Sequence, residues 1–165
     1  MRGIKMGEIL VDQGVLTPEQ VSHILAEQRD TARPFGELAE ALYGVSPRTI
    51  EDAWVTQYLD VVGITDLEQV RIDVDCLRVL NRRQAWQFHL LPLNRDGGEL
   101  TMATDEFSIA RALSFATRAI SEEVFLVVAT RRQLREFLMR HFPVPRELAE
   151  FSERLARPAE ATRQG

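Results

Sequence analysis

The sequence is short of residues that form cross-links or reactive sites. It contains one cysteine, Cys76, in 165 residues, which excludes a disulfide within the chain. Cys76 stands in an apolar-patterned stretch, and free cysteines are among the most buried residue types. We therefore expect Cys76 to fill a small space in the core, in a protein that works in the reducing cytoplasm.

Long apolar runs and an excess of positive charge are also missing. No stretch of 18 apolar residues occurs, so no membrane span is expected. The segment after residues 1–5 is amphipathic, which is not typical of a signal peptide. The formal net charge is −5, and a protein that binds nucleic acid non-specifically needs a basic face. We therefore expect no nucleic-acid partner.

The usual catalytic and metal-binding motifs are absent. The sequence has neither a Gly-x-x-x-x-Gly-Lys-Ser/Thr phosphate loop nor a His-Glu-x-x-His pair. The three histidines lie far apart, and we interpret His23 and His89 as surface or boundary residues. No nucleophile–base pair is visible. We therefore predict that the protein is not an enzyme and holds neither a metal nor a cofactor.

Two acidic pairs have a structural interpretation. Asp73 and Asp75 could suggest a metal site, but such residues more often flank a strand or cap the next helix. Asp105 and Glu106 precede an expected helix, where acidic side chains favour the positive end of the helix dipole. We expect structural roles for both pairs.

A duplicated helical unit is the clearest pattern that is present. Residues 5–28 and 34–57 carry a glycine, a proline and a glutamine at the same offset, which are Gly7 with Gly36, Pro18 with Pro47 and Gln28 with Gln57 (36 − 7 = 29). A fixed period at such positions is typical of repeated supersecondary structure. With 45% hydrophobic residues, the chain is expected to be globular. Two small-helix units with glycines near a basic residue can form a symmetric ligand site.

The repeat defines an expected helical subdomain over residues 1–62. Thr17 and Ser46 each precede a proline and are expected to cap a helix. Gly14 is expected to end the first helix, and residues 29–34 to connect the two copies.

A second subdomain with a different pattern of apolar and polar residues is expected over residues 68–142. We predict strands at 70–74, 89–93, 99–104 and 124–128, with the last one buried at the centre of the sheet. Helices are predicted at 76–86, 107–118 and 131–141, and a Gly97-Gly98 hairpin turn joins two strands. The tail, 143–165, is expected to form one helix over 146–157 and to be disordered from 158. The fold class is therefore α+β, with a helical repeat subdomain followed by a small α/β sandwich that has a short mixed sheet.

Over residues 5–142 the sequence resembles the N-terminal domain of type II secretion and type IV pilus assembly ATPases. This includes the MshEN domains, which bind cyclic di-GMP. In the second half the resemblance rests on three stretches: Arg78-Val79-Leu80, 89–101 around His89 and Gly97, and Val127-Val128-Ala129-Thr130. The resemblance implies a regulatory and docking module without the ATPase core of the family.

The first copy is similar to the family's dinucleotide motif, which runs Arg-Leu-Gly, an aliphatic pair, Gly, a second aliphatic pair, and a late Gln. The resemblance implies a ligand role for matching residues of this copy, which are Lys5, Met6, Gly7, Leu10, Val11, Gly14, Val15, Leu16 and Gln28. A cation suits a phosphate, and glycines let the backbone approach the ligand. Lysine keeps the charge of the family's arginine but cannot form the bidentate hydrogen bonds of a guanidinium.

The second copy departs from the motif. It keeps Gly36 and Gln57 and has Phe35 in place of leucine, whereas Pro34 stands at the arginine position beside Arg33. The aliphatic pair is replaced by alanine and by Glu40, whose charge in a phosphate site would repel the ligand. Candidate ligand residues here are Arg33, Phe35, Gly36 and Gln57. The alternative interpretation is that the glycines only permit close helix packing and that Phe35 and Trp54 belong to the core.

Two functions remain open from the sequence. The first is a non-enzymatic docking module that binds a protein partner in a secretion, pilus or signalling assembly. The alternative is a cyclic di-GMP receptor that uses the first copy, Lys5 to Gln28.

Overall fold

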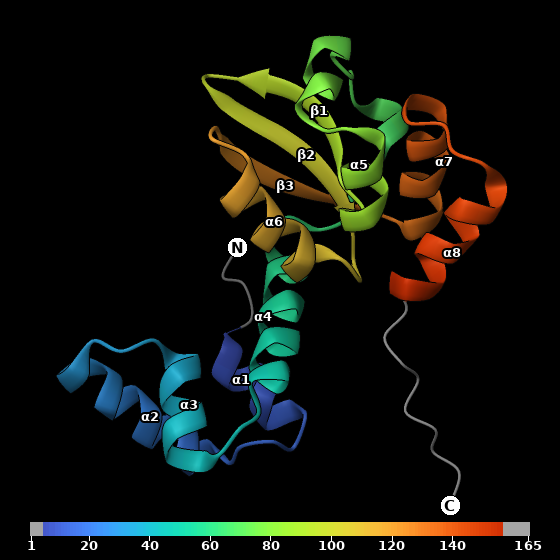
Figure 1. The fold of residues 1–165 in the computed structure, drawn as a ribbon. Coiled ribbons are helices and arrows are strands. Elements are labelled where there is room, and N and C mark those ends of the chain that lie inside the picture. Colours follow the sequence, from blue (N-terminus) through green and yellow to red (C-terminus); the bar gives the residue numbers. More distant parts are fainter. Residues whose placement is uncertain (1–4, 157–165) are drawn as a thin grey trace, which may run out of the picture. The chain divides into compact units, whose positions relative to one another are not determined.

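The structure is a computed structural model that describes residues 5–156 (Figure 1). The chain divides into two compact units, unit 1 (Met1–Gly63) and unit 2 (Ile64–Gly165). Unit 1 is helical, whereas unit 2 combines helices with a three-stranded sheet. The α+β fold class predicted from the sequence is confirmed. The disorder predicted from residue 158 lies outside the described residues.

Four helices make up unit 1, namely α1 (Met6–Asp12), α2 (Pro18–Thr31), α3 (Phe35–Tyr43) and α4 (Pro47–Val62). The predicted caps are confirmed, because the Gln20 N–H donates to Thr17 Oγ1 and the Thr49 N–H donates to Ser46 Oγ. The predicted connector at 29–34 is wrong in its first half. There α2 continues to Thr31 and ends at Ala32, whose left-handed φ of 55° terminates the helix.

Both short helices end at a glycine with positive φ. Gly14 follows α1 with φ 69°, and Gly44 ends α3 with φ 65°. By the repeat offset Tyr43 stands where Gly14 stands; α3 runs two residues further than α1 (12 + 29 = 41, against an end at Tyr43), and Gly44 supplies the turn instead. The missing glycine at 43 is thus replaced one position later.

The core of unit 1 is built from equivalent positions of the two copies. Its buried residues form four pairs with the same offset as the repeat (for the first, 38 − 9 = 29), which are Ile9 with Leu38, Leu10 with Ala39, Leu16 with Val45 and Ile24 with Ala53. The duplication inferred from the sequence is therefore a duplication of packing.

The helices of the two copies pack crosswise. α1 contacts α4, and α2 contacts α3. In each crosswise pair a large core residue accompanies a small one, Leu10 with Ala53 and Ile24 with Ala39. Core volume is thereby conserved between the two pairs. The alanine at 39, which departs from the motif, therefore has a packing explanation.

The sheet of unit 2 has the order β1-β2-β3, with β1 (Leu91–Asp96) antiparallel to β2 (Glu99–Asp105) and β3 (Glu123–Ala129) parallel to β2. The predicted hairpin is confirmed, with φ of 56° at Gly97 and 89° at Gly98. The prediction that 124–128 is the central strand is wrong. β2 is central, and β3 is an edge strand whose Phe125 side chain is 43% exposed.

Helices cover this sheet. α6 (Ile109–Ala119) packs against β2 and β3, and α7 (Arg131–His141) packs against β1 and β2. Consecutive residues Met102 to Asp105 of β2 are all buried, so both faces of the central strand are covered. Unit 2 also contains α5 (Arg82–Phe88) and α8 (Arg146–Ala156). The helices predicted at 107–118, 131–141 and 146–157 are confirmed within two residues at each end.

The segment before α5 differs from the prediction. Residues 70–74 form no strand, and two 3₁₀ turns, η1 (Leu67–Gln69) and η2 (Val74–Val79), occupy this region. Asp73 Oδ1 accepts a hydrogen bond of 3.0 Å from the Asp75 N–H, so the predicted capping role of this pair is confirmed. The helix predicted over 76–86 is interrupted, because Asn81 caps a new helix. Cys76 is fully buried, as expected.

No helix among residues 5–156 is long and apolar enough to cross a membrane.

Candidate functional site

Unit 1 contains a cavity of about 470 Å³ that residues of both copies line. The first copy contributes through α1 and α2, and the second through α3 and α4. The lining residues are Lys5, Met6, Gly7, Glu8, Val21, Leu25, Pro34, Phe35, Gly36 and Gln57.

The cavity lies between equivalent segments of the two copies. Lys5, Met6 and Gly7 from the first copy face it together with their equivalents from the second, which are Pro34, Phe35 and Gly36. These six residues are the N-cap and the first two residues of α1 and of α3. The same short segment of the repeat therefore forms the cavity twice.

The charge of the cavity is mixed. Within residues 5–156, Lys5 is the only basic residue that lines the cavity, and its side chain is exposed. Glu8 also lines the cavity, and its Oε2 accepts a hydrogen bond of 3.2 Å from the Lys5 backbone N–H. At the position equivalent to Lys5, Pro34 supplies no charge. An anion in this cavity meets one cation and one nearby carboxylate.

Arg33 is not among the residues that line the cavity. Its Nε and Nη2 donate to Glu37 Oε1 at 2.9 and 2.7 Å. The Arg33 guanidinium is thus paired with a carboxylate of α3, four residues further along the chain. Glu40, whose charge we expected to oppose a ligand, does not line the cavity either.

Both glycines at the cavity are also required by packing. A Cβ built on Gly7 would lie 2.7 Å from Val21 Cγ1, and one on Gly36 would lie 2.6 Å from Ile50 Cγ2. Val21 and Ile50 are themselves equivalent positions of the repeat. The packing interpretation of the glycines is therefore supported by the structure, and it is compatible with a ligand at the same place.

The remaining predicted ligand residues do not line this cavity. Leu10 and Leu16 are buried in the core. Gly14 and Val15 are exposed beyond the end of α1. Val11 lines a second hollow of about 270 Å³ beside α1, and Gln28 of α2 is partly buried.

Four lining residues were absent from the predicted set. Val21 and Leu25 stand at two leucine positions of the family's dinucleotide motif, so the resemblance itself could have included them. Glu8 stands three residues after the N-cap, where a carboxylate folds back on the cap N–H. Pro34 was recognised only as a missing arginine.

Unit 2 contains a buried polar pair that the sequence did not reveal. His89 Nδ1 lies 2.7 Å from Asp105 Oδ2, and both side chains are almost fully buried. The prediction that His89 is a surface or boundary residue is wrong, because it caps α5 in a left-handed conformation and points inward. Burial alone would raise the pKa of Asp105, but the hydrogen bond and charge of His89, with the Phe107 N–H, hold it below its usual range.

Metal-binding chemistry has no visible basis in the described part of the chain. No group of three His, Cys, Asp or Glu side chains within residues 5–156 is placed to hold a metal ion.

Comparison with known proteins gives one family match and several structural ones. The sequence profile of the MshEN domain matches residues 59–148, which is more than half of the chain. No curated protein matches. A solved structure described as MshE with cdg shares 21% identity, with 84% of this chain and 99% of that chain covered, at a TM-score of 0.48. The N-terminal domain of XpsE shares 19% identity, with 85% and 99% covered, at a TM-score of 0.43.

Proposed function

Because this chain belongs to the MshEN domain family, we propose that it is a non-enzymatic regulatory module that binds cyclic di-GMP in unit 1 and docks on a protein partner. The profile match begins at residue 59 and therefore does not include the cavity in unit 1. The ligand proposal rests on the geometry of unit 1 itself.

The observation that carries the ligand proposal is the pairing of repeat positions around the cavity. Positions 5, 6 and 7 and their equivalents 34, 35 and 36 line the same cavity of about 470 Å³. Its volume lies in the range of small-molecule sites, roughly 300–1,000 Å³. Met6, Phe35, Val21 and Leu25 offer apolar surfaces to flat bases, while Lys5 offers a cation to a phosphate.

The same residues predict modest affinity. Lys5 is a single point charge without the two-pronged geometry of arginine. Glu8 at the same cavity repels an anion, and the exposed setting screens both charges. We therefore expect a dissociation constant in the micromolar range, about −8 kcal/mol or weaker.

Isothermal titration calorimetry with cyclic di-GMP, with GMP as the control ligand, tests this proposal. Lys5→Ala should weaken binding by about 1–3 kcal/mol, the scale for losing a charged hydrogen-bond partner. Arg29→Ala is the matched control, since it removes an exposed cation at the end of α2 that does not line the cavity. It should leave binding unchanged.

Two results would count against the ligand role. One is no heat and no thermal shift up to about 100 µM ligand, because a bound ligand stabilises the folded state. The other is an equal loss of affinity in Lys5→Ala and Arg29→Ala, which would reveal a general charge effect rather than a site.

Protein docking is supported by a separate observation in unit 2. Arginines and exposed apolar side chains border one groove there. Such a combination is enriched at protein interfaces, where aromatic residues and arginine contribute much of the binding energy.

A further inference from the structure

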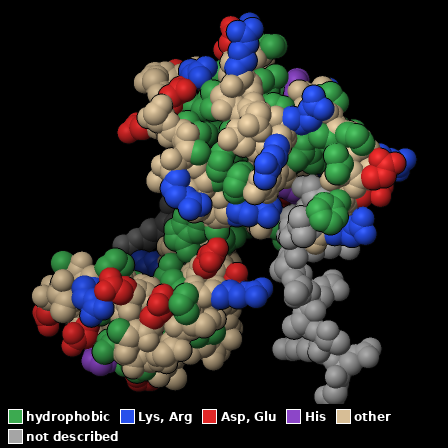
Figure 2. Space-filling model, viewed as in Figure 1, with side chains coloured by type: hydrophobic (Ala, Val, Ile, Leu, Met, Phe, Trp, Pro, Cys, Tyr) green, Lys and Arg blue, Asp and Glu red, His purple; other side chains and the backbone are tan. Residues whose placement is uncertain are grey.

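A groove of about 730 Å³ lies on unit 2 between α5, α6 and α8. The first two turns of α5 provide Arg82, Arg83, Trp86 and Gln87, and α6 provides Arg111. The opposite wall comes from the segment around α8, with Val144, Leu148 and Phe151. Figure 2 shows Lys and Arg side chains beside hydrophobic ones over this part of unit 2.

The three arginines of the groove form no salt bridge with a side chain of the described residues. No carboxylate is among the described residues that line the groove. Within residues 5–156, Arg82, Arg83 and Arg111 make no ion pair within 4.0 Å, whereas Arg95 is paired with Glu122 and Arg146 with Glu150. The chain as a whole carries a net charge of −5. The groove is therefore a local cationic site on an acidic protein.

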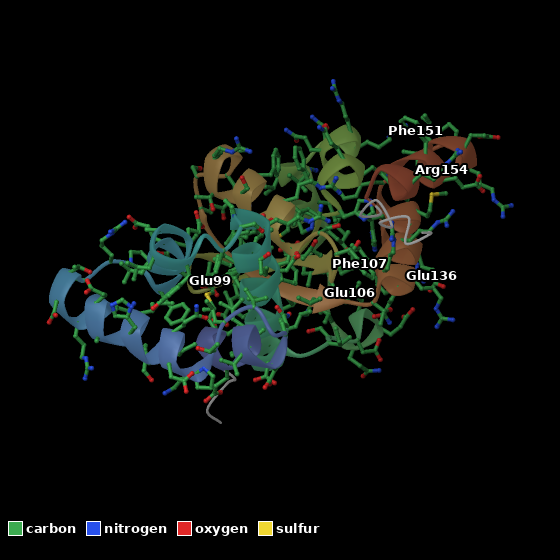
Figure 3. All side chains as sticks on the ribbon, turned by 90° about the horizontal axis from the view of Figure 1, so that it is seen from below. Glu99, Glu106, Phe107, Glu136, Phe151 and Arg154 are labelled. Carbon is green, nitrogen blue, oxygen red and sulfur yellow. The ribbon has the colours of Figure 1, made fainter. Side chains whose placement is uncertain are left out.

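Between these arginines lies an apolar strip. Trp86 is 5% exposed, and its indole N–H already donates to the Phe142 carbonyl at 2.7 Å. Leu148 and Phe151 of α8 are 57% and 54% exposed and stand three residues apart, on one face of the helix. Figure 3 shows Phe151 projecting from α8. Leu148 and Phe151 thus present apolar surface that the described residues leave uncovered, above the buried Trp86.

We infer that this groove docks an acidic amphipathic helix of a partner protein. Arg82 and Arg83 on α5 and Arg111 on α6 supply positive charge beside the apolar strip, which matches a helix whose apolar stripe is flanked by Asp and Glu. The inference rests on the docking half of the proposed function and names the chemistry of the partner.

The electrostatics of Arg111 agree with such an occupant. Burial lowers the pKa of this guanidinium, and the charge of Arg131 lowers it further, although Asp105 acts in the opposite direction. Its positive charge is thus incompletely compensated in the free protein. A carboxylate from a partner would compensate it.

Fluorescence anisotropy with a labelled synthetic helix tests the inference. The probe is a peptide of about 15 residues with leucine at i, i+4, i+7 and i+11 and glutamate on both flanks. The comparison peptide carries lysine in place of each glutamate. We expect the acidic peptide to bind at least about ten-fold more tightly, with an affinity that falls as salt is raised.

Paired variants locate the binding. Arg82→Glu combined with Arg111→Glu should weaken the acidic peptide at least about ten-fold. Arg48→Glu combined with Arg132→Glu changes the net charge equally at exposed residues outside the groove, and it should have little effect. Phe151→Ala should weaken binding without changing its salt dependence. Circular dichroism checks that each variant keeps its helices.

Several outcomes would overturn the inference. These are equal binding of the acidic and basic peptides, equal effects of the two charge variants, or sedimentation of the chain with phosphatidylglycerol vesicles while the peptide does not bind. Self-association that the Arg82/Arg111 variant abolishes would assign the groove to a second copy. Calorimetry with cyclic di-GMP is independent of all of these. Failure of the groove therefore leaves the ligand proposal standing, and the reverse also holds.

Discussion

Gly7 and Gly36 occupy equivalent places in the two copies, and a Cβ at either would collide with a β-branched side chain of the next helix in the same copy. Val21 and Ile50 have stiff χ1 angles, so their methyl groups cannot easily move aside. At these two positions the repeat is constrained by contact rather than by backbone conformation, since neither glycine has a positive φ.

Gly7→Ala should destabilise unit 1 by about 1–3 kcal/mol, the usual cost of overpacking a core. The reason is the separation of 2.7 Å between the new Cβ and Val21 Cγ1. Urea denaturation measures the change. The double variant Gly7→Ala/Val21→Ala should show a coupling that partly restores stability relative to the sum of the single effects. Strict additivity would mean that Val21 is not the obstacle.

Pro34→Arg should strengthen cyclic di-GMP binding by about 1.5–3 kcal/mol, because it supplies a charged donor opposite Lys5. The backbone φ of −58° at position 34 is accessible to arginine. The affinities are compared by calorimetry. Arg33→Ala serves as the control and should have no effect, since the Arg33 side chain is bonded to Glu37. If Pro34→Arg left the affinity unchanged and Arg33→Ala weakened binding, Arg33 rather than position 34 would contact the ligand.

Which side chains reach the cavity could be predicted only in part. Residues 5–7 and their equivalents 35 and 36 follow from the repeat, because they form the starts of the equivalent helices α1 and α3. Arg33 could not be excluded in the same way. Its direction depends on the competing carboxylate of Glu37, four residues later, and sequence spacing allows either outcome.

At the scale of elements, the sequence correctly predicted features that depend on residues close together in the chain. Thr17 and Ser46 cap the helices that they were predicted to cap, because a capping bond spans only three residues. Sheet order was not predictable from such signals. The apolar run at 124–128 is typical of a central strand, yet β3 lies at the edge of the sheet, where β2 is its neighbouring strand.

The end of β2 carries the buried pair of Asp105 and His89, which ties the strand to the residue that ends α5. This link was invisible in the sequence, because 16 residues and a hairpin separate the two side chains. A buried carboxylate with a lowered pKa stabilises the folded state above its ordinary pKa of 3.8.

Unit 2 should therefore lose stability as the pH falls below about 3.8 and Asp105 becomes protonated through its lowered pKa. Asp105→Asn should cost about 3–5 kcal/mol at neutral pH, the scale for breaking a buried pair, and should flatten the acid limb of the stability profile. Urea denaturation across this pH range measures both effects. Asp96→Asn, at an exposed carboxyl of the hairpin, is the control. An unchanged acid limb in Asp105→Asn would assign acid unfolding to other groups.

At the scale of the whole molecule, each unit has its own core. The core of unit 1 consists of repeat positions within residues 9–53, whereas unit 2 encloses its sheet with α6 and α7. Residues 64–165, expressed alone, should keep the secondary structure of unit 2 and unfold in one cooperative transition. Circular dichroism during thermal unfolding tests this. A fragment without a transition would mean that unit 2 depends on unit 1.

The crosswise packing of α1 on α4 and of α2 on α3 has one more consequence. The helices of each of these two pairs belong to different copies of the repeat, and only residues 32–34 join the two copies. If this joint opened, the first copy of one molecule could pair with the second copy of another. Two chains would then rebuild both cavities by domain swapping, and a symmetric dimer would hold the same sites as two separate monomers.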